Sequence, residues 1–205
     1  PSIFLRLAGC NLSCGLTERS IQEYDGDMEP DEGATWVCDS IPVWREPDQT
    51  LNPEELTEEM KNRGFFDLLD SHSHLILTGG EPMLPAHQER IEALLRYWDT
   101  QYDVVPFVEV ETNGTFFPEQ YLRWNVDQWN VSMKLSNSGM EYERRINPEA
   151  IDFFKTAHEV HNVNPSPISG DAIFKFVVSD DEDMIEVNDL IDDFRIHDSQ
   201  ISLMP

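Results

Sequence analysis

The chain has 205 residues, of which 40% are hydrophobic, and its 40 acidic against 14 basic residues give a formal net charge of −26. Such a charge repels phosphate backbones and anionic lipid, which argues against nucleic acid and membranes as partners. No segment approaches the roughly 20 apolar residues of a membrane helix, and no basic-then-apolar leader is present. We therefore expect a soluble, cytoplasmic protein with a solvated acidic surface.

Strand-like and helix-like segments alternate along the whole chain. The predicted strands are 3–8, 74–78, 107–110, 129–135, 173–178 and 201–203, and the predicted helices begin at Asn52–Pro53 and at 147–149 or span 87–97, 118–124 and 181–194. This order implies a parallel sheet with right-handed crossovers. We expect one α/β domain over 1–205, an incomplete (β/α)6 barrel whose parallel sheet is open on one side. A flat doubly wound sheet is the alternative. In both, the functional loops lie at the carboxyl ends of the strands.

The chain opens directly in a strand without an initiator Met and closes in another strand, so we expect residues to be missing at both ends. The polar, acidic stretch at about 15–35 has no clear period and is predicted to be an inserted loop.

Three cysteines follow the first predicted strand. Cys10 and Cys14 are four residues apart, and Cys38 comes 24 residues later, on the far side of the predicted loop. An odd number of cysteines does not favour a disulfide framework. Three thiolates can hold a [4Fe–4S] cluster whose remaining iron binds the amino and carboxylate groups of S-adenosylmethionine. The alternatives are buried cysteines used as small hydrophobic residues, or a zinc site, which would need a fourth ligand.

Further polar motifs lie at the ends of the next strands. Thr78–Pro82 contains two glycines, which allow close approach of a ligand to free backbone N–H and C=O groups, although a simple strand-to-helix turn is the alternative. Glu109 and Glu111 share one face of a strand, and Glu111, nearer the strand end, is the better candidate to bond a ribose diol. A solvent-facing pair is the other interpretation. Ser132 and Lys134 likewise share one face of the fourth strand.

Five segments together resemble the 7-carboxy-7-deazaguanine synthases, which are radical S-adenosylmethionine enzymes of 7-deazapurine biosynthesis. These segments are Arg6–Cys14, Cys38–Ser40, Leu77–Pro82, Glu109–Thr115 and Ser132–Gly139. They recur in order along the whole chain. The Cys-x3-Cys and Gly-Gly-Glu-Pro motifs are specific to the radical superfamily, and the last two segments point to this member of it. The chain departs from the family in the long spacing before the third cysteine and in lacking a Gln-Gly-Glu-Gly-type substrate stretch.

The resemblance implies a role for residues in each of these segments. The cluster ligands are Cys10, Cys14 and Cys38, the substrate residues are Arg6 and Thr78, and Ser40 anchors Mg²⁺. Contacts to S-adenosylmethionine are expected from Val37, Asp39, Gly79, Gly80, Glu81, Glu111, Asn113, Ser132, Met133, Lys134, Leu203 and Met204. No side chain acts as a catalytic acid or base, because the radical comes from the cofactor. Arg6 as a charge paired inside the barrel is the competing interpretation.

The implied reaction is that of a carbon–nitrogen lyase. It converts 6-carboxy-5,6,7,8-tetrahydropterin to 7-carboxy-7-deazaguanine with loss of ammonia, for queuosine, archaeosine or modified DNA. The implied partners are the small pterin substrate, a flavodoxin- or ferredoxin-type reductant, and a second copy in a homodimer. Two alternatives stay open: a radical activase acting on a protein partner, and a non-catalytic iron–sulfur or zinc module.

Overall fold

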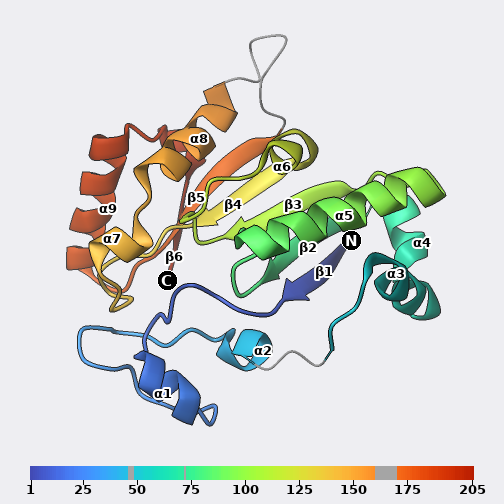
Figure 1. Cartoon of the computed structure of the whole chain (residues 1–205). Coiled ribbons are helices and arrows are strands. Elements are labelled where there is room, and N and C mark those ends of the chain that lie inside the picture. The colour runs from blue at the N-terminus through green and yellow to red at the C-terminus, as the bar shows by residue number, and fades with distance from the viewer. Residues whose placement is uncertain (46–48, 72, 160–169) are drawn as a thin grey trace.

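The computed structural model describes residues 1–45, 49–71, 73–159 and 170–205, in which six strands form one parallel sheet in chain order (Figure 1). The strands are β1 (Ser2–Leu7), β2 (His74–Gly79), β3 (Phe107–Thr112), β4 (Gln128–Ser132), β5 (Asp171–Val177) and β6 (Ile201–Met204). Each strand pairs with the next one along the chain, whereas a doubly wound sheet would reverse its direction at a switch point. The predicted open (β/α)6 type of sheet is confirmed.

Helices connect successive strands. The larger ones are α3 (Pro53–Asn62), α5 (Pro85–Tyr102), α8 (Pro148–Glu159) and α9 (Asp181–Phe194), and the short ones are α1 (Glu18–Glu23), α2 (Ile41–Arg45), α4 (Phe65–Asp70), α6 (Gln120–Asn125) and α7 (Tyr142–Arg145). Because right-handed crossovers that always advance in one direction place their helices on one side, one face of the sheet is covered and the other stays open.

Burial along the strands agrees with this arrangement. In β5, Ala172, Phe174 and Phe176 are fully buried, and the residues between them are only partly buried. The buried set packs with Trp98 of α5 and Phe154 of α8 in one core cluster. The alternate residues of each strand form the opposite surface, which we call the inner face.

Local sequence signals explain the helix boundaries that the sequence predicts well. Helix α3 begins at Asn52 with a capping box, in which the Asn52 side chain accepts from the Glu55 N–H while the Glu55 carboxylate accepts from the Asn52 N–H. Helix α9 spans the predicted 181–194 and is capped by Asp180. The predicted strand 129–135 is wrong at its end, because β4 stops at Ser132 and the chain turns there.

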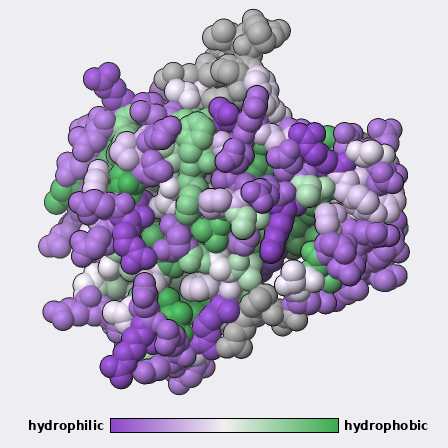
Figure 2. Space-filling model, in the orientation of Figure 1, coloured by the Kyte–Doolittle hydropathy of each residue, from purple (hydrophilic) through white to green (hydrophobic). Residues whose placement is uncertain are grey.

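The surface of the molecule is mainly polar. Figure 2 shows hydrophilic residues over most of one face, with hydrophobic residues gathered toward its middle. Within the residues that the structure describes, no helix combines the length and the apolar character needed to cross a membrane.

Candidate functional site at the carboxyl ends of the strands

The three cysteines lie on neighbouring backbone segments at the carboxyl end of β1. The chain leaves β1 through Cys10 and Cys14, passes through α1 and returns to Cys38, as the blue-to-cyan part of Figure 1 shows. The Cys38 N–H donates to the Cys14 carbonyl at 3.1 Å. The backbone therefore brings the third cysteine back beside the second, although 23 residues separate them.

Two of the thiols, Cys10 and Cys14, lie in a desolvated environment. Burial raises the pKa of Cys10 to about 12, and the nearby Glu81, Cys14 and Cys38 add to this effect. Burial also raises the pKa of Cys14 to about 11, although the positive charge of Lys134 lowers it in part. Binding an iron centre would therefore displace protons from these thiols and supply the positive charge that the thiolates lack.

The two glycines at the carboxyl end of β2 are required because the end of β1 and the first cysteine loop pack directly against them. A Cβ on Gly79 would lie 2.2 Å from the Leu7 carbonyl oxygen, and one on Gly80 would lie 1.9 Å from that of Gly9. The N–H groups of Gly80 and Glu81 donate to the carbonyls of Leu7 and Gly9, both at 2.9 Å. The expectation that the N–H groups of this turn are free for a ligand is therefore wrong for these two, because they hold the turn against the Cys10 loop.

Glu81 is fully buried, and its carboxylate accepts three hydrogen bonds from the protein. Its donors are the N–H of Met83 at 2.8 Å, the hydroxyl of Thr112 at 2.7 Å and the N–H of Asn113 at 2.7 Å. Burial raises the pKa of Glu81, and these donors oppose the shift because they favour the ionised form. The Glu81 side chain thus joins the Gly-Gly turn to the loop after β3, and a contact of this residue with S-adenosylmethionine stays a prediction.

Asn113, also expected near the cofactor, lies against the first cysteine. Its Nδ2 donates to Asn11 Oδ1 at 2.9 Å and lies 4.0 Å from Cys10 Sγ. Asn11 in turn donates to Thr115 Oγ1 at 2.9 Å. The loops after β1, β2 and β3 thus form one hydrogen-bonded unit around Cys10.

The predicted substrate residues come together on the inner face. Arg6 of β1 is the register partner of Thr78 of β2, and Arg6 is exposed. The Thr78 hydroxyl donates to Glu111 Oε2 at 2.9 Å, and Lys175 Nζ of β5 lies 3.6 Å from Glu111 Oε1. Lys175 is not among the sequence-predicted residues, although its place in the alternation of β5 puts it on this face.

The two glutamates of β3 differ in what surrounds them. Glu109, farther from the strand end, contacts His74 Nδ1 at 2.5 Å and accepts from Asn130 Nδ2 at 3.2 Å. Glu111 lies nearer the carboxyl end, and 40% of its side chain is exposed. Of the two, Glu111 is therefore the carboxylate more open to a ligand at this end of the sheet.

Ser132 and Lys134 lie together, but through a turn and not along a strand. Lys134 Nζ donates to Ser132 Oγ at 2.6 Å and lies 5.8 Å from the centre of the Trp36 ring. The side chain of Met133 between them is buried. Met133 can therefore offer only its backbone to a ligand. The Lys134 side chain instead lies near Trp36, two residues before Cys38.

The remaining predicted residues are spread around this end of the sheet. Asp39 is exposed, and its Oδ1 accepts from the Ser40 hydroxyl at 3.0 Å, just before α2. Val37 is partly buried beside Cys38. Met204 is the register partner of Val177 on the inner face, whereas Leu203 pairs with Phe176 of the covered face. The Leu203 side chain is thus directed away from the other predicted ligands.

A cavity of about 1120 Å³ lies along the free edge of β1 and reaches the carboxyl end of that strand. It is lined by residues of β1, α2, α3 and α5, and it shares Arg6 with the site. The chemical motifs themselves lie beside it and not within it, so we locate the site from those side chains.

The donor set fits an iron–sulfur cluster better than a structural zinc ion. The sequence has three cysteines, and tetrahedral structural zinc takes four ligands, whereas a [4Fe–4S] cluster on three thiolates keeps one iron open. Within the described ranges, no three His, Cys, Asp or Glu side chains are grouped tightly enough to count as a metal site. The evidence that the cysteines converge is the backbone hydrogen bond between Cys38 and Cys14, together with the effect of Cys38 in raising the pKa values of Cys10 and Cys14.

Comparison with known proteins gives one consistent name. No family model matches the chain. It is 28% identical over 217 residues to the 7-carboxy-7-deazaguanine synthase of Halobacterium salinarum, covering 100% of this chain and 69% of the relative. The synthase of Pyrobaculum aerophilum is 28% identical over 207 residues, with 100% and 70% covered. That of Clostridium acetobutylicum is 28% identical over 197 residues, with 95% and 67% covered.

Proposed function

We infer that this chain belongs to the 7-carboxy-7-deazaguanine synthases, and we propose that it converts 6-carboxy-5,6,7,8-tetrahydropterin to 7-carboxy-7-deazaguanine with loss of ammonia. One observation carries this proposal. The three cysteine segments, the Gly-Gly-Glu-Pro turn, Glu111 and the Ser132–Lys134 pair meet at one end of the sheet in a chain similar over its length to proteins of that name.

The chain's own residues hold and orient the reactants. Cys10, Cys14 and Cys38 would ligate the cluster, and Ser132, Lys134 and Glu111 would bind S-adenosylmethionine on the inner face beside it. When bound, the cluster and S-adenosylmethionine together supply a carbon-centred radical that can abstract a hydrogen atom. The exposed guanidinium of Arg6 suits a bidentate contact with the pterin carboxylate, and Thr78 is its neighbour in register.

We also propose that Ser40 anchors a magnesium ion that orients the substrate carboxylate. Magnesium prefers a few protein oxygens together with water and substrate oxygens, and the Ser40 hydroxyl lies 3.0 Å from an exposed carboxylate oxygen of Asp39.

Reduction of the cluster would need an electron donor of the flavodoxin or ferredoxin type. We further expect the protein to be a homodimer in the cytoplasm.

The proposed reaction is tested by product formation from the complete, anaerobically reconstituted protein. With reductant, S-adenosylmethionine and the tetrahydropterin, it should form many equivalents of the deazaguanine acid for each cofactor consumed. Single Cys10→Ala, Cys14→Ala and Cys38→Ala variants should lose the iron–sulfur absorbance and the product together. An activase would consume one cofactor for each radical formed on its partner. A protein that retains the cluster and cleaves the cofactor but forms no product would contradict the synthase assignment.

The magnesium proposal has a separate test. Ser40→Ala should weaken the stimulation of product formation by Mg²⁺ more than it weakens cleavage of S-adenosylmethionine. Ser71→Ala, which removes an exposed hydroxyl at the end of α4, serves as the control. An unchanged magnesium dependence in Ser40→Ala would remove this residue from the metal site.

A further inference from the structure

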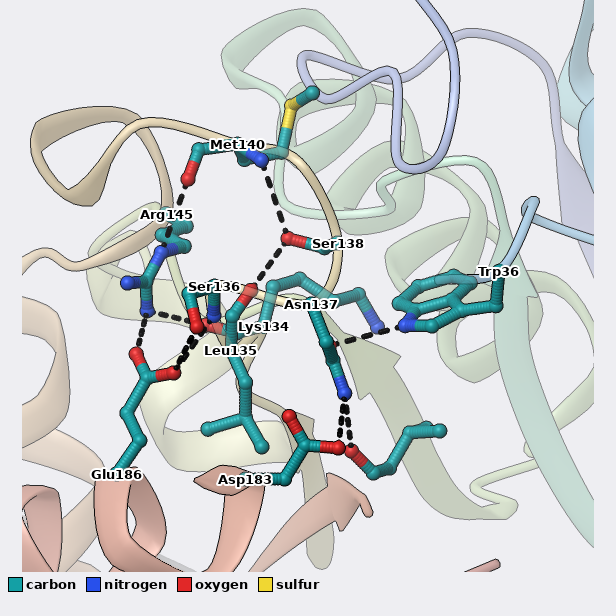
Figure 3. Close-up of polar contacts among 11 residues, drawn as sticks. Trp36, Lys134, Leu135, Ser136, Asn137, Ser138, Met140, Arg145, Asp183 and Glu186 are labelled. Atoms are coloured by element: carbon teal, nitrogen blue, oxygen red, sulfur yellow. Dashed lines mark hydrogen bonds and ion pairs between the residues drawn. The ribbon is translucent and has the colours of Figure 1, made fainter. Parts of the chain in front are cut away.

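We propose that Asn137 is a positioning residue for Cys38, and that it clamps the returning end of the long segment between the second and third cysteines. The inference rests on the proposed role of Cys38 as a cluster ligand, but the packing that carries it involves this chain alone. Asn137 lies in the β4–α7 loop, residues 133–141, which connects β4 to α7 (Figure 3).

The β4–α7 loop contacts both ends of the segment that separates the cysteines. At the outgoing end, the Gly15 N–H donates to the Ser138 carbonyl at 2.9 Å. At the returning end, the Thr35 N–H donates to the Asn137 carbonyl at 2.9 Å, and Ala34 forms an isolated antiparallel bridge with Ser138. The first contact involves the residue directly after Cys14, and the second involves a residue three positions before Cys38. One loop therefore holds both ends of the segment that joins these two cysteines.

The side chain of Asn137 uses both ends of its amide. Its Oδ1 accepts from the Trp36 indole Nε1–H at 3.0 Å, two residues before Cys38. Its Nδ2 donates to the Val177 carbonyl at 3.0 Å and to Asp183 Oδ2 at 2.9 Å. Figure 3 shows Trp36 approaching the amide from one side and Asp183 from another. The buried amide thus links the Cys38 segment to the end of β5 and to α9.

The partners of Asn137 are themselves fixed. Asp183 is buried, and its Oδ2 also accepts from the Ser179 N–H at 2.7 Å. The same loop is held by Arg145, which is 6% exposed, forms a 2.7 Å ion pair with Glu186 and donates to the Lys134 carbonyl at 2.9 Å. Because a satisfied, buried polar network has few alternative arrangements, Trp36 is held in one place against a rigid support.

The contacts of Asn137 explain how the long segment between Cys14 and Cys38 is compatible with a site built from three cysteines. The entropic cost of closing a loop grows only slowly with its length, but its ends must still be fixed for the cysteines to meet. The hydrogen bond between Cys38 N–H and the Cys14 carbonyl brings the two backbones together. Asn137 adds a side-chain hydrogen bond that orients residues Trp36 to Cys38. The same contact keeps Trp36 beside Lys134.

The test compares thiol reactivity in the metal-free protein, so it does not depend on enzyme activity. We expect Asn137→Ala to raise the rate of Cys38 alkylation by iodoacetamide about fivefold relative to Cys10, the factor expected from the loss of one hydrogen bond. Trp36→Phe keeps the ring but removes the N–H donor, and it should raise the same ratio. The double variant should add little to Asn137→Ala, because both changes remove the same contact.

Gln200→Ala is the matched control. Gln200 is also buried and bridges two segments, since its Nε2 donates to the carbonyls of Lys155 at 3.4 Å and Ala172 at 3.2 Å, but it has no contact with a cysteine loop among those described. This variant should lower thermal stability without changing the Cys38 to Cys10 ratio. An unchanged ratio in Asn137→Ala, or in Trp36→Phe if Asn137→Ala does not fold, would overturn the positioning role. Iron retention in the presence of a chelator should fall in the same variants, and retention equal to wild type would also contradict it. The alkylation ratio is measured without cofactors, so it tests the role of Asn137 independently of product formation. An unchanged ratio with normal product formation would overturn the role of Asn137 alone, whereas a changed ratio without product would overturn the proposed function alone.

Discussion

At the scale of single residues, Glu81 shows how a residue of the predicted site can also hold the fold together. Its carboxylate is fully buried and accepts from three protein donors. Its function in this chain is to hold the loop after β3 against the turn after β2, and through Asn113 to support Cys10.

We therefore expect Glu81→Gln to destabilise the protein by about 1–3 kcal/mol, because a side-chain NH2 would replace an acceptor and leave a buried donor unpaired. The measurement is urea denaturation at neutral pH. Glu92→Gln, which removes only the charge of a largely exposed pair with Arg96, should change the free energy of unfolding by less than about 0.5 kcal/mol. Equal effects of the two changes would mean that the three hydrogen bonds of Glu81 contribute little.

Single-residue roles were predictable from sequence only where the spacing along one strand decides them. The alternation of β3 places Glu109 and Glu111 on one face, and the structure has both there. Two of the three donors to Glu81, Thr112 and Asn113, lie 31 and 32 positions away in the chain, and the side-chain partners of Asn137 are a tryptophan and an aspartate on separate segments. Such contacts depend on how loops pack against one another, and loops lack the periodic spacing of side chains that makes strand and helix faces predictable.

At the scale of elements, the loops after β1 and β2 interlock so closely that no side chain fits between them. Gly80 does not have a positive φ, and its requirement for glycine comes only from the Gly9 carbonyl oxygen, which lies 1.9 Å from the place of a Cβ. The Cys10 loop therefore depends on the turn after β2 for its position.

Gly80→Ala should push this turn away from the Cys10 loop, with a loss of about 3 kcal/mol in unfolding free energy, because backbone must move to admit the methyl group. Gly26→Ala is the matched control. Gly26 has φ +103° but nothing within 4 Å of its Cβ position, so it tests conformational strain without a clash. The comparison uses thermal unfolding and iron content after reconstitution. Iron binding and stability in Gly80→Ala equal to those of Gly26→Ala would contradict the close-packing argument.

The elements that the sequence predicts best are those with caps or long periods. Helices α3 and α9 begin at Asn52–Pro53 and Asp181 as expected, and all six strands are found. Helices α1, α2, α4 and α7 were not predicted, since each has at most six residues, too few for a helical period to show. The end of β4 at Ser132 was missed because Met133 and Leu135 are buried outside the strand and continue its apolar pattern.

At the scale of the whole molecule, the net charge of −26 is the dominant feature. Acidic residues that repel one another favour the expanded, unfolded chain at low ionic strength, and salt screens this repulsion. The inner face retains positive groups in this acidic molecule, with Arg6 and Lys175 placed near Thr78 and Glu111.

Stability should consequently rise with salt. Between about 0.05 M and 1 M KCl, where the screening length falls to about 3 Å, we expect the unfolding free energy in urea to increase by at least about 1 kcal/mol. Sucrose at matched osmolality is the control that separates screening from solute exclusion. A urea midpoint that stays constant or falls as KCl is added would show that charge repulsion does not limit stability.

The central proposal is that this chain acts as a 7-carboxy-7-deazaguanine synthase, and an isotope measurement tests it most directly. The complete, reconstituted protein is given 6-carboxytetrahydropterin labelled with deuterium at C6, and the recovered S-adenosylmethionine is analysed by mass spectrometry. The account predicts that the deazaguanine acid forms over many turnovers and that deuterium appears at the 5′ position of the recovered cofactor, because the hydrogen removed from the substrate is returned through it. Product without deuterium in the cofactor, or stoichiometric 5′-deoxyadenosine without product, would contradict the account.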